Sequence, residues 1–339
     1  MRRISVNLGK NSYDIIIEKG ITGRVGDYIT AKKTAVITDE NVDRLYGDSV
    51  VSSIGGEVKK LVLPSGEETK SFDKLMAVYD FLLEFKITRS DMIVALGGGV
   101  IGDLTGFAAA TVLRGVPFIQ VPTSLLAQVD SSVGGKVAVN SKFGKNLIGA
   151  FYQPKAVLID IDCLKTLDKR FFADGMAEVI KYGCIRDAEL FDTLANEDIS
   201  EKMEGIIERC CDIKRAVVEA DEFDTGERMI LNFGHTLGHA VENYYDYKNY
   251  THGEAVAIGM YNISLIGEKL GVTPKGTAEK IKAVLEKYNL PYFLDVDKKA
   301  LANAIELDKK SESDKINIIF LEKIGNSVIK KLSKIEVLG

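Results

Sequence analysis

The sequence has no tryptophan, and its 339 residues include few cysteines, prolines and histidines. None of the four cysteines, Cys163, Cys184, Cys210 and Cys211, belongs to a CxxC pair, so we expect free thiols and a reducing, cytoplasmic environment. No apolar run approaches the roughly 18 residues of a membrane span, so we expect no membrane partner. The basic start Met1-Arg2-Arg3 lacks a following apolar stretch, which argues against a secretory signal.

The sequence also lacks a basic excess. Lysine and arginine total 44 against 49 acidic residues, which gives a net charge of −5. Proteins that bind nucleic acids usually carry the opposite balance, so we expect no nucleic-acid partner, although a local cationic pocket for a small anion stays compatible. With 46% hydrophobic and 27% charged residues, the composition is that of a globular protein. At roughly 150 residues per domain, the length predicts two domains.

The first third of the chain alternates β-branched runs with helical periodicity. One apolar helix face is expected from Phe72, Leu75, Met76, Tyr79, Leu82 and Leu83, and a second helix at 103–112. Strands that alternate with helices predict parallel βαβ units and a nucleotide-binding layer. The expected strands are 12–17, 34–38, 57–63, 92–96 and 117–121.

From about Cys163 the pattern becomes mainly helical, with a short return of strand character at 316–321. We therefore predict an α/β plus α fold. A Rossmann-like parallel-sheet domain is expected at 1–160 and a mainly helical domain at 161–339. The expected helices of the second domain cover 177–182, 201–219, 231–245 and 253–270.

A glycine loop, Leu96-Gly97-Gly98-Gly99-Val100-Ile101-Gly102-Asp103, follows an expected strand and precedes a helix. It satisfies GxGxxG, which fits either a pyrophosphate at a helix N-terminus or a tight, closely packed turn. No acidic residue lies about 20 positions downstream, where the usual fingerprint has its ribose ligand. Asp39, at the end of an earlier strand, is better placed to bind ribose hydroxyls.

The only three histidines, His235, His239 and His252, fall within 18 positions. His235 and His239 are four residues apart in an expected helix, so spacing alone favours them as a pair of metal ligands. The third ligand is either His252, in an expected loop, or a carboxylate such as Glu178. Glu178 also has Lys181 three residues on, which is compatible with a simple surface ion pair. Ordinary core or surface histidines are the alternative to a metal site.

A cationic, glycine-rich stretch contains Arg114, Lys136, Lys142, Lys145 and Asn146. Lysines beside flexible glycines suit a phosphate or carboxylate group. Ordinary solvated lysines are the alternative.

Several long runs, in order along the chain, resemble the 3-dehydroquinate synthases of the sugar-phosphate cyclase group. These are LGGGVIGDLTGFAAATVLRGVPFIQVPTSLLAQVDSSVGGKVAVN (96–140), GKNLIGAFYQP (144–154), AEVIKYG (177–183), NFGHTLGHAVE (232–242) and HGEAVAIGM (252–260). The resemblance implies a homodimeric two-domain enzyme with NAD+ and a divalent metal, zinc or cobalt, in the cleft between its domains. The implied reaction converts 3-deoxy-D-arabino-heptulosonate 7-phosphate into 3-dehydroquinate and phosphate, toward chorismate and aromatic amino acids. It proceeds by transient oxidation, phosphate β-elimination, re-reduction and intramolecular aldol closure.

The resemblance also implies site residues. The metal ligands become Glu178, His235 and His252, which moves His239 from the ligand pair to the substrate phosphate. Arg114 reaches a phosphate from the partner subunit, and Lys136 and Lys145 also approach the cofactor. The implied NAD+ contacts are Asp39, Ser65, Gly66, Glu67, Glu68, Thr69, Lys70, Gly99, Val100, Ile101, Gly102, Asp103, Thr123, Ser124, Cys163, Leu164, Lys165 and Thr166. The implied substrate contacts are Asp130, Lys136, Asn146, Lys181, Lys214, Arg228, Asn232, His239 and Lys310.

Two positions depart from the family pattern. Thr123-Ser124 stands where Thr-Thr is common, which keeps the hydroxyl. The usual glycine after Lys310 is absent, which leaves Lys309 and Lys310 as alternatives for the substrate contact. Three other functions stay open: a cyclase that makes 2-deoxy-scyllo-inosose or an epi-valiolone, a metal-dependent NAD alcohol dehydrogenase, and a non-catalytic nucleotide-sensing module.

Overall fold

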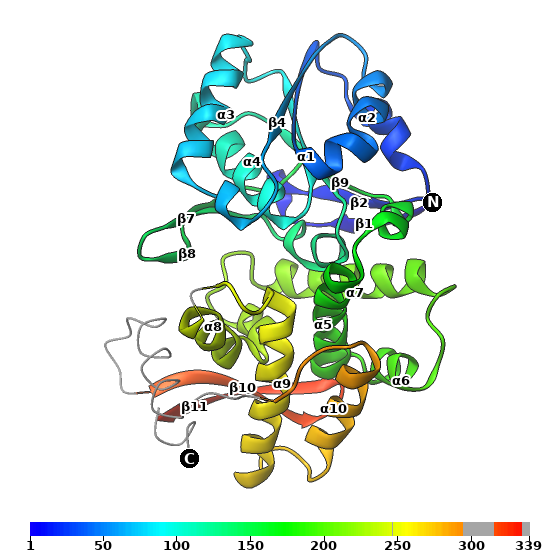
Figure 1. Cartoon of the computed structure of the whole chain (residues 1–339), viewed down its shortest axis with the longest axis vertical. Helices are drawn as coiled ribbons and strands as arrows, with labels where there is room; N and C mark the ends of the chain where they lie inside the picture. The colour runs from blue at the N-terminus through cyan, green and yellow to red at the C-terminus, as the bar shows by residue number, and fades with distance from the viewer. Residues whose placement is uncertain (246, 294–314, 334–339) are drawn as a thin grey trace. The chain divides into compact units, whose positions relative to one another are not determined.

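The computed structural model describes residues 1–245, 247–293 and 315–333 (Figure 1). The chain forms two compact units. The first comprises Met1–Asp168 and Lys214–Phe223, and the second comprises Lys169–Ile213 with the described residues from Asp224 onward. The domain boundary at residue 160 stays a prediction.

The first unit is built on a seven-stranded sheet with the order β1-β2-β9-β6-β5-β3-β4. Only β1 and β2 pair antiparallel, and the other neighbours are parallel, which confirms the predicted parallel-sheet layer. The strands are β1 (Arg2–Val6), β2 (Tyr13–Ile17), β3 (Lys33–Asp39), β4 (Glu57–Leu63), β5 (Met92–Gly97), β6 (Phe118–Pro122) and β9 (Ala156–Ile159).

Helices cover both faces of this sheet (Figure 1). On one face α3 (Phe72–Glu84) and α4 (Gly99–Thr111) contribute to a core with β3, β5 and β6. On the other, α2 (Asp48–Ser53) and the 3-10 segment Ile21–Tyr28 pack on the same strands. Short α1 (Glu40–Val42) directly follows β3. A sheet buried on both faces explains why its central strands are continuous β-branched runs.

The predicted apolar face of α3 is wrong in part. Leu75 and Leu82 are buried, but Phe72, Met76 and Leu83 are 44%, 54% and 53% exposed. The buried stripe consists of Leu75, Val78 and Leu82, at spacings of three and four residues, and Phe72, Met76 and Leu83 lie on the neighbouring stripe of the helix.

A second feature of the first unit, a hairpin outside the main sheet, was not predicted. It consists of β7 (Lys136–Ser141) and β8 (Gly144–Phe151), paired antiparallel.

The second unit is mainly helical, as predicted. Its elements are α5 (Lys169–Arg186), α6 (Ala188–Asn196), the start of α7 (Met203–Ala220), α8 (His235–Tyr244), α9 (His252–Lys269), α10 (Thr277–Lys287) and the hairpin of β10 (Lys315–Lys323) with β11 (Asn326–Ser333). Helix α9 packs against α5, α8 and α10, so α5 and α8 reach the same central helix. Within the described ranges, none of the helices is both long and apolar enough to cross a bilayer.

Candidate functional site

The first unit gathers polar and glycine residues at the carboxyl ends of its parallel strands. Strand β4 lies on one side of β3 while β5 lies on the other, so the strand order reverses between β3 and β5. Such a switch point is where open α/β sheets bind nucleotides. Asp39 ends β3 and Gly97 ends β5. The other implied NAD+ contacts also follow strand ends: Ser65–Lys70 after β4, Thr123 and Ser124 after β6, and Cys163–Thr166 after β9.

The glycine loop joins β5 to α4, which begins at Gly99, earlier than the predicted residue 103. A Cβ at Gly97 would lie 2.7 Å from Cβ of Ile101, and one at Gly102 would lie 2.6 Å from Oε1 of Gln120. Close packing therefore explains these two glycines. At Gly98 the nearest atom would be Ser124 Oγ at 3.4 Å, and Gly98 provides no side chain to cap α4. The amide groups of this helix N-terminus suit an anion.

Two carboxylates of the first unit are held at these strand ends. Asp39 accepts hydrogen bonds from the backbone amides of Asn41 at 2.9 Å and Val42 at 3.1 Å. Burial raises the pKa of Asp39, although these two donors oppose the shift. Asp103 forms an ion pair with the buried Lys70. Burial raises the pKa of Asp103, and Lys70 counteracts part of that effect.

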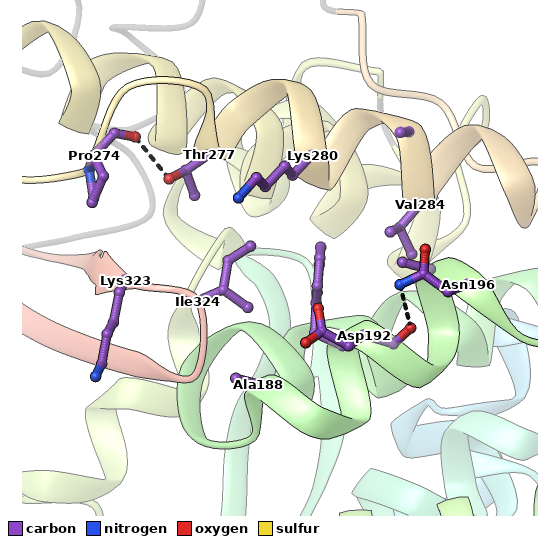
Figure 2. A pocket seen from close by; sticks show the side chains of 12 residues that line it. Ala188, Asp192, Asn196, Pro274, Thr277, Lys280, Val284, Lys323 and Ile324 are labelled. Atoms are coloured by element: carbon purple, nitrogen blue, oxygen red, sulfur yellow. Dashed lines mark hydrogen bonds between the residues drawn. The ribbon is translucent and has the colours of Figure 1, made fainter.

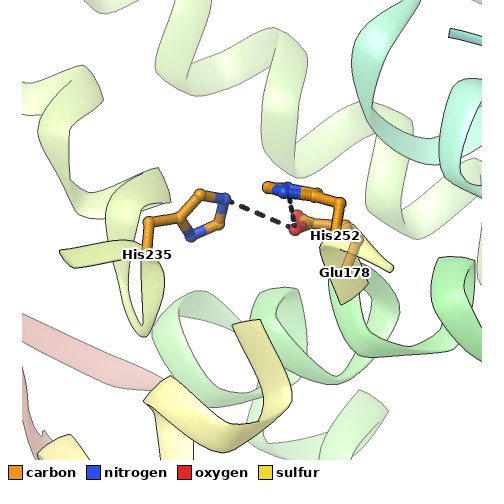
Figure 3. Close-up of side chains that lie close together, drawn as sticks. All are labelled: Glu178, His235 and His252. Atoms are coloured by element: carbon orange, nitrogen blue, oxygen red, sulfur yellow. Dashed lines mark ion pairs between the residues drawn. The ribbon is translucent and has the colours of Figure 1, made fainter. Parts of the chain in front are cut away.

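In the second unit, Glu178, His235 and His252 converge (Figure 3). Glu178 lies on α5, while His235 and His252 are the first residues of α8 and α9. Glu178 Oε1 is 3.5 Å from His235 Nε2 and 3.6 Å from His252 Nε2. One ligand atom from each residue lies within 4.8 Å of the others.

The structure corrects the expected loop position of His252. Thr251 caps α9 through the amide of Glu254, whose side chain accepts from the Thr251 amide at 2.9 Å. The run Thr251-His252-Gly253-Glu254 is a capping-box sequence, which was the available signal for a helix start.

Each imidazole is oriented by its other nitrogen. His235 Nδ1 is 3.1 Å from the backbone oxygen of Phe233, and His252 Nδ1 is 3.5 Å from Glu242 Oε2. Acceptors behind the ring leave Nε2 of each histidine for a metal, the usual arrangement of metal-binding histidines. Two imidazoles and one carboxylate fit zinc or cobalt and leave a coordination position for substrate.

The surroundings of the two rings shift their pKa values in opposite directions. Burial lowers the pKa of His235 to about 3, which keeps this ring neutral and able to bind a metal. Burial also acts to lower the pKa of His252, but the Glu178 and Glu242 carboxylates outweigh it and raise that pKa well above its ordinary value.

Glu178 also forms an ion pair with Lys181, and both side chains are buried, at 0% and 1% exposure. A buried pair is not the surface ion pair that the i, i+3 spacing alone allowed. A charged lysine held beside the carboxylate places a hydrogen-bond donor next to the candidate metal site.

His239 lies close to the other two histidines. Its ring centre is 5.5 Å from that of His235 and 6.1 Å from that of His252. Although His235 and His239 share α8 as spacing predicted, Glu178 groups with His235 and His252. His239 instead groups with Glu242 and His252.

The other implied substrate residues are divided between the two units. In the first, Lys214 pairs with Asp130 at 2.8 Å. Lys136 begins β7, Lys145 and Asn146 lie in β8, and Arg114 is exposed with a positive φ of 64°. In the second, Arg228 is buried and Asn232 is exposed. Lys309 and Lys310 lie outside the described residues.

The sequence did not single out two acidic residues that lie beside the candidate metal site. Glu242 is seven residues after His235 on α8, and Asp174 is four residues before Glu178 on α5. Both spacings place each carboxylate on the same helix face as a candidate ligand, which was the missed signal.

A separate depression of about 600 Å³ lies among α6, α10 and the turn between β10 and β11 (Figure 2). Phe191 and Val284 line it together with the exposed Lys280 and Lys323. None of the implied site residues that the structure describes lines this depression.

Known proteins with similar sequences indicate the family of this chain. Models of the 3-dehydroquinate synthase N-terminal and C-terminal domains match residues 60–174 and 175–311. The chain is 55% identical to a 3-dehydroquinate synthase of Clostridium botulinum, covering 97% of this chain and 98% of the relative.

Solved structures of sugar-phosphate cyclases share the fold. A 2-deoxy-scyllo-inosose synthase complexed with carbaglucose-6-phosphate, NAD+ and Co2+ has a TM-score of 0.90 and 26% identity, covering 99% of this chain and 98% of that one. A 2-epi-5-epi-valiolone synthase of Streptomyces hygroscopicus, with NAD+ and Zn2+ bound, has a TM-score of 0.88 and 24% identity, covering 96% of this chain and 94% of that one. At this identity the similarity bears on the fold alone. Because both family models match in order and the identity extends over nearly the whole length, the chain belongs to the 3-dehydroquinate synthase family.

Proposed function

We propose that this chain converts 3-deoxy-D-arabino-heptulosonate 7-phosphate into 3-dehydroquinate and phosphate, a step of the shikimate pathway. The observation that carries the proposal is the convergence of Glu178, His235 and His252 in a chain of this family. Identity of 55% to a 3-dehydroquinate synthase, against 26% to the inosose synthase, favours this reaction over that of another cyclase.

The proposed metal ligands are Glu178, His235 and His252, with zinc or cobalt as the ion. When bound, the ion supplies a Lewis acid for substrate hydroxyls and NAD+ supplies a reversible hydride acceptor. Lys181 is buried beside Glu178. Together with Asn232, it positions the hydroxyls and the carboxylate of the substrate. The donor set, together with the acceptors that orient the two histidine rings, supports these ligands.

The substrate phosphate is bound by Lys136, Arg114 and His239 in this proposal. Charged donors to a phosphate are strong and directional, so they hold the leaving group in position. The remaining substrate contacts are Asp130, Asn146, Lys214, Arg228 and Lys310. The ion pair of Lys214 with Asp130, 2.8 Å long, supports a joint role for these two residues.

NAD+ binds, in this proposal, along the carboxyl edge of the sheet in the first unit. Asp39 accepts hydrogen bonds from the ribose hydroxyls, and the uncapped N-terminus of α4 binds the pyrophosphate. The support is the reversal of strand order between β3 and β5, at which both features lie.

We also propose a cytoplasmic homodimer. All four cysteines are buried and, among the described residues, form no disulfide, which supports a reducing compartment. The exposed apolar residues Phe72, Met76 and Leu83 on α3 form a surface suited to a second copy of the chain.

The deciding experiment measures phosphate release from the heptulosonate phosphate by the purified chain, with and without a chelator. We expect release that depends on the metal, formation of 3-dehydroquinate, and no lasting NADH absorbance because the hydride returns. Turnover of glucose 6-phosphate instead would indicate a different cyclase. Stoichiometric accumulation of NADH would indicate a dehydrogenase.

A further inference from the structure

Helix α5 presents Arg170, Asp174 and Glu178 at intervals of four residues, so the three side chains share one face. Each of them contacts the segment that begins α9. Arg170 donates to both carboxylate oxygens of Glu254, at 2.7 and 2.8 Å, and to the backbone oxygen of Asn249 at 3.2 Å. Glu178 faces His252 at the far end of this stripe.

Asp174 makes the middle contact, and it is a contact to the main chain. Its Oδ1 accepts a hydrogen bond of 2.5 Å from the amide of Gly253, the residue after His252. The Asp174 side chain is buried. Because the first amides of a helix have no partner within the helix, this bond satisfies a group that burial would otherwise leave unbonded.

The backbones of α5 and α9 also approach each other at this point. A Cβ on Gly253 would lie 2.0 Å from the backbone oxygen of Asp174. Glycine is therefore required at 253 for this approach. Asp174 precedes Glu178 by one helical turn and Gly253 adjoins His252, so the Asp174–Gly253 contact sets the separation of the two candidate ligands.

We propose that Asp174 is a positioning residue whose hydrogen bond to Gly253 fixes the distance between Glu178 and His252 and thereby the affinity of the metal site. This inference rests on the ligand set of the proposed function. In this proposal Asp174 is not itself a ligand: its role is to keep two ligands, carried by different helices, at the spacing that a single ion requires.

The test compares Zn2+ affinity, by competition with a chromogenic chelator, in full-length wild-type, Asp174→Ala and Asp174→Asn proteins. We expect Asp174→Ala to bind Zn2+ roughly 10- to 100-fold more weakly, the range typical of lost ligand-orienting contacts. Asp174→Asn keeps an oxygen acceptor for the Gly253 amide, so we expect its affinity to stay within a few-fold of wild type. The visible spectrum of bound Co2+ reports whether the coordination geometry changes in parallel.

Asp187→Ala is the matched control. Asp187 also accepts a bond from a helix N-terminal amide, that of Leu190 at 2.9 Å on α6, but lies outside the ligand stripe. We expect it to lower the melting temperature without changing Zn2+ affinity. If Asp174→Ala does not fold by circular dichroism, Gly253→Ala replaces it, because this change keeps the carboxylate and displaces the first turn of α9.

Wild-type affinity in Asp174→Ala, or an equal loss in Asp187→Ala, would overturn the positioning role. Failure of the ligand set gives a different result: wild-type protein would bind no stoichiometric Zn2+, or His252→Ala would bind it as tightly as wild type.

Discussion

His252 lies between two carboxylates, with Nε2 3.6 Å from Glu178 and Nδ1 3.5 Å from Glu242. The ring is therefore oriented from behind while it faces the candidate metal position. Glu242 is buried on α8, the helix that also carries His235, so one helix supplies a ligand and orients another.

Removing the Glu242 carboxylate tests this orientation. We expect Glu242→Ala to weaken Zn2+ binding roughly 10- to 100-fold, because His252 loses the acceptor that fixes its ring. Chelator competition measures the change, and circular dichroism checks the fold. Unchanged affinity would show that His252 does not need this acceptor.

A pair of histidine variants separates ligand from substrate contact. We expect His252→Ala to abolish metal retention and turnover with the fold intact, as a lost ligand requires. His239→Ala should keep the metal and lose turnover, since His239 is proposed to bind the substrate phosphate. Metal content by atomic absorption and phosphate release give the two readouts, and a metal-free but fully active His252→Ala protein would contradict the ligand assignment.

Lys136 at the start of β7 tests the phosphate site. We expect Lys136→Met to lower kcat/KM roughly 10- to 150-fold, because hydrogen bonds to charged groups contribute about 1.5–3 kcal/mol. NAD+ should still bind, as measured by fluorescence titration. Lys142→Met, at the exposed turn of the same hairpin, is the control and should have near wild-type kinetics; wild-type kinetics in Lys136→Met would remove Lys136 from the site.

His235 predicts a pH dependence of stability in the metal-free protein. Its pKa falls from 6.5 in the unfolded chain to about 3 in the fold, so between these values the unfolded state binds more protons. Stability from this residue is therefore full above pH 6.5 and declines toward pH 3, by at most about 1.4 kcal/mol per pH unit. His252, with its raised pKa, acts in the opposite sense, and its contribution is lost as the pH rises above 6.5.

Urea unfolding of the chelated protein at pH 4.5 to 7.5 measures this effect. We expect His235→Asn to be less sensitive to acid than wild type between pH 4.5 and 6.5. An identical pH slope in both proteins would contradict the low pKa of His235.

The exposed face of α3 tests the homodimer. We expect Met76→Glu to shift the protein toward a monomer in light scattering, because a charge in an apolar interface is costly to bury. Leu265→Glu on α9 changes an exposed apolar residue of the second unit and should leave the mass unchanged. A monomeric wild-type protein would remove the dimer proposal itself.

The sequence predicted the bounds of several strands of the main sheet closely. The strand at 57–63 was predicted with its observed bounds, and those at 34–38 and 92–96 to within one residue at each end, because β-branched runs mark paired strands. The hairpin of β7 and β8 was missed, since most of β8 is exposed and its sequence, with two glycines and one lysine, lacks apolar–polar alternation.

The candidate site shows the limit of one-dimensional spacing. Spacing favoured His235 with His239 because four residues are one helical turn. The structure groups His235 with His252 and Glu178, which come from three helices, and only the packing of α5, α8 and α9 creates that proximity. The family resemblance provided the grouping that periodicity does not contain.

Both histidines of this group occupy the first position of their helices. Helix beginnings carry partial positive charge, and Lys181 adds a full one beside Glu178. With a divalent cation bound, the positive charges of the ion, Lys181 and the two helix beginnings would outweigh the carboxylates of Glu178 and Glu242. A site with this charge would favour reactants rich in negative oxygens and the alkoxide form of a bound hydroxyl, so the position of both histidines at helix beginnings would help to lower the pKa of that hydroxyl.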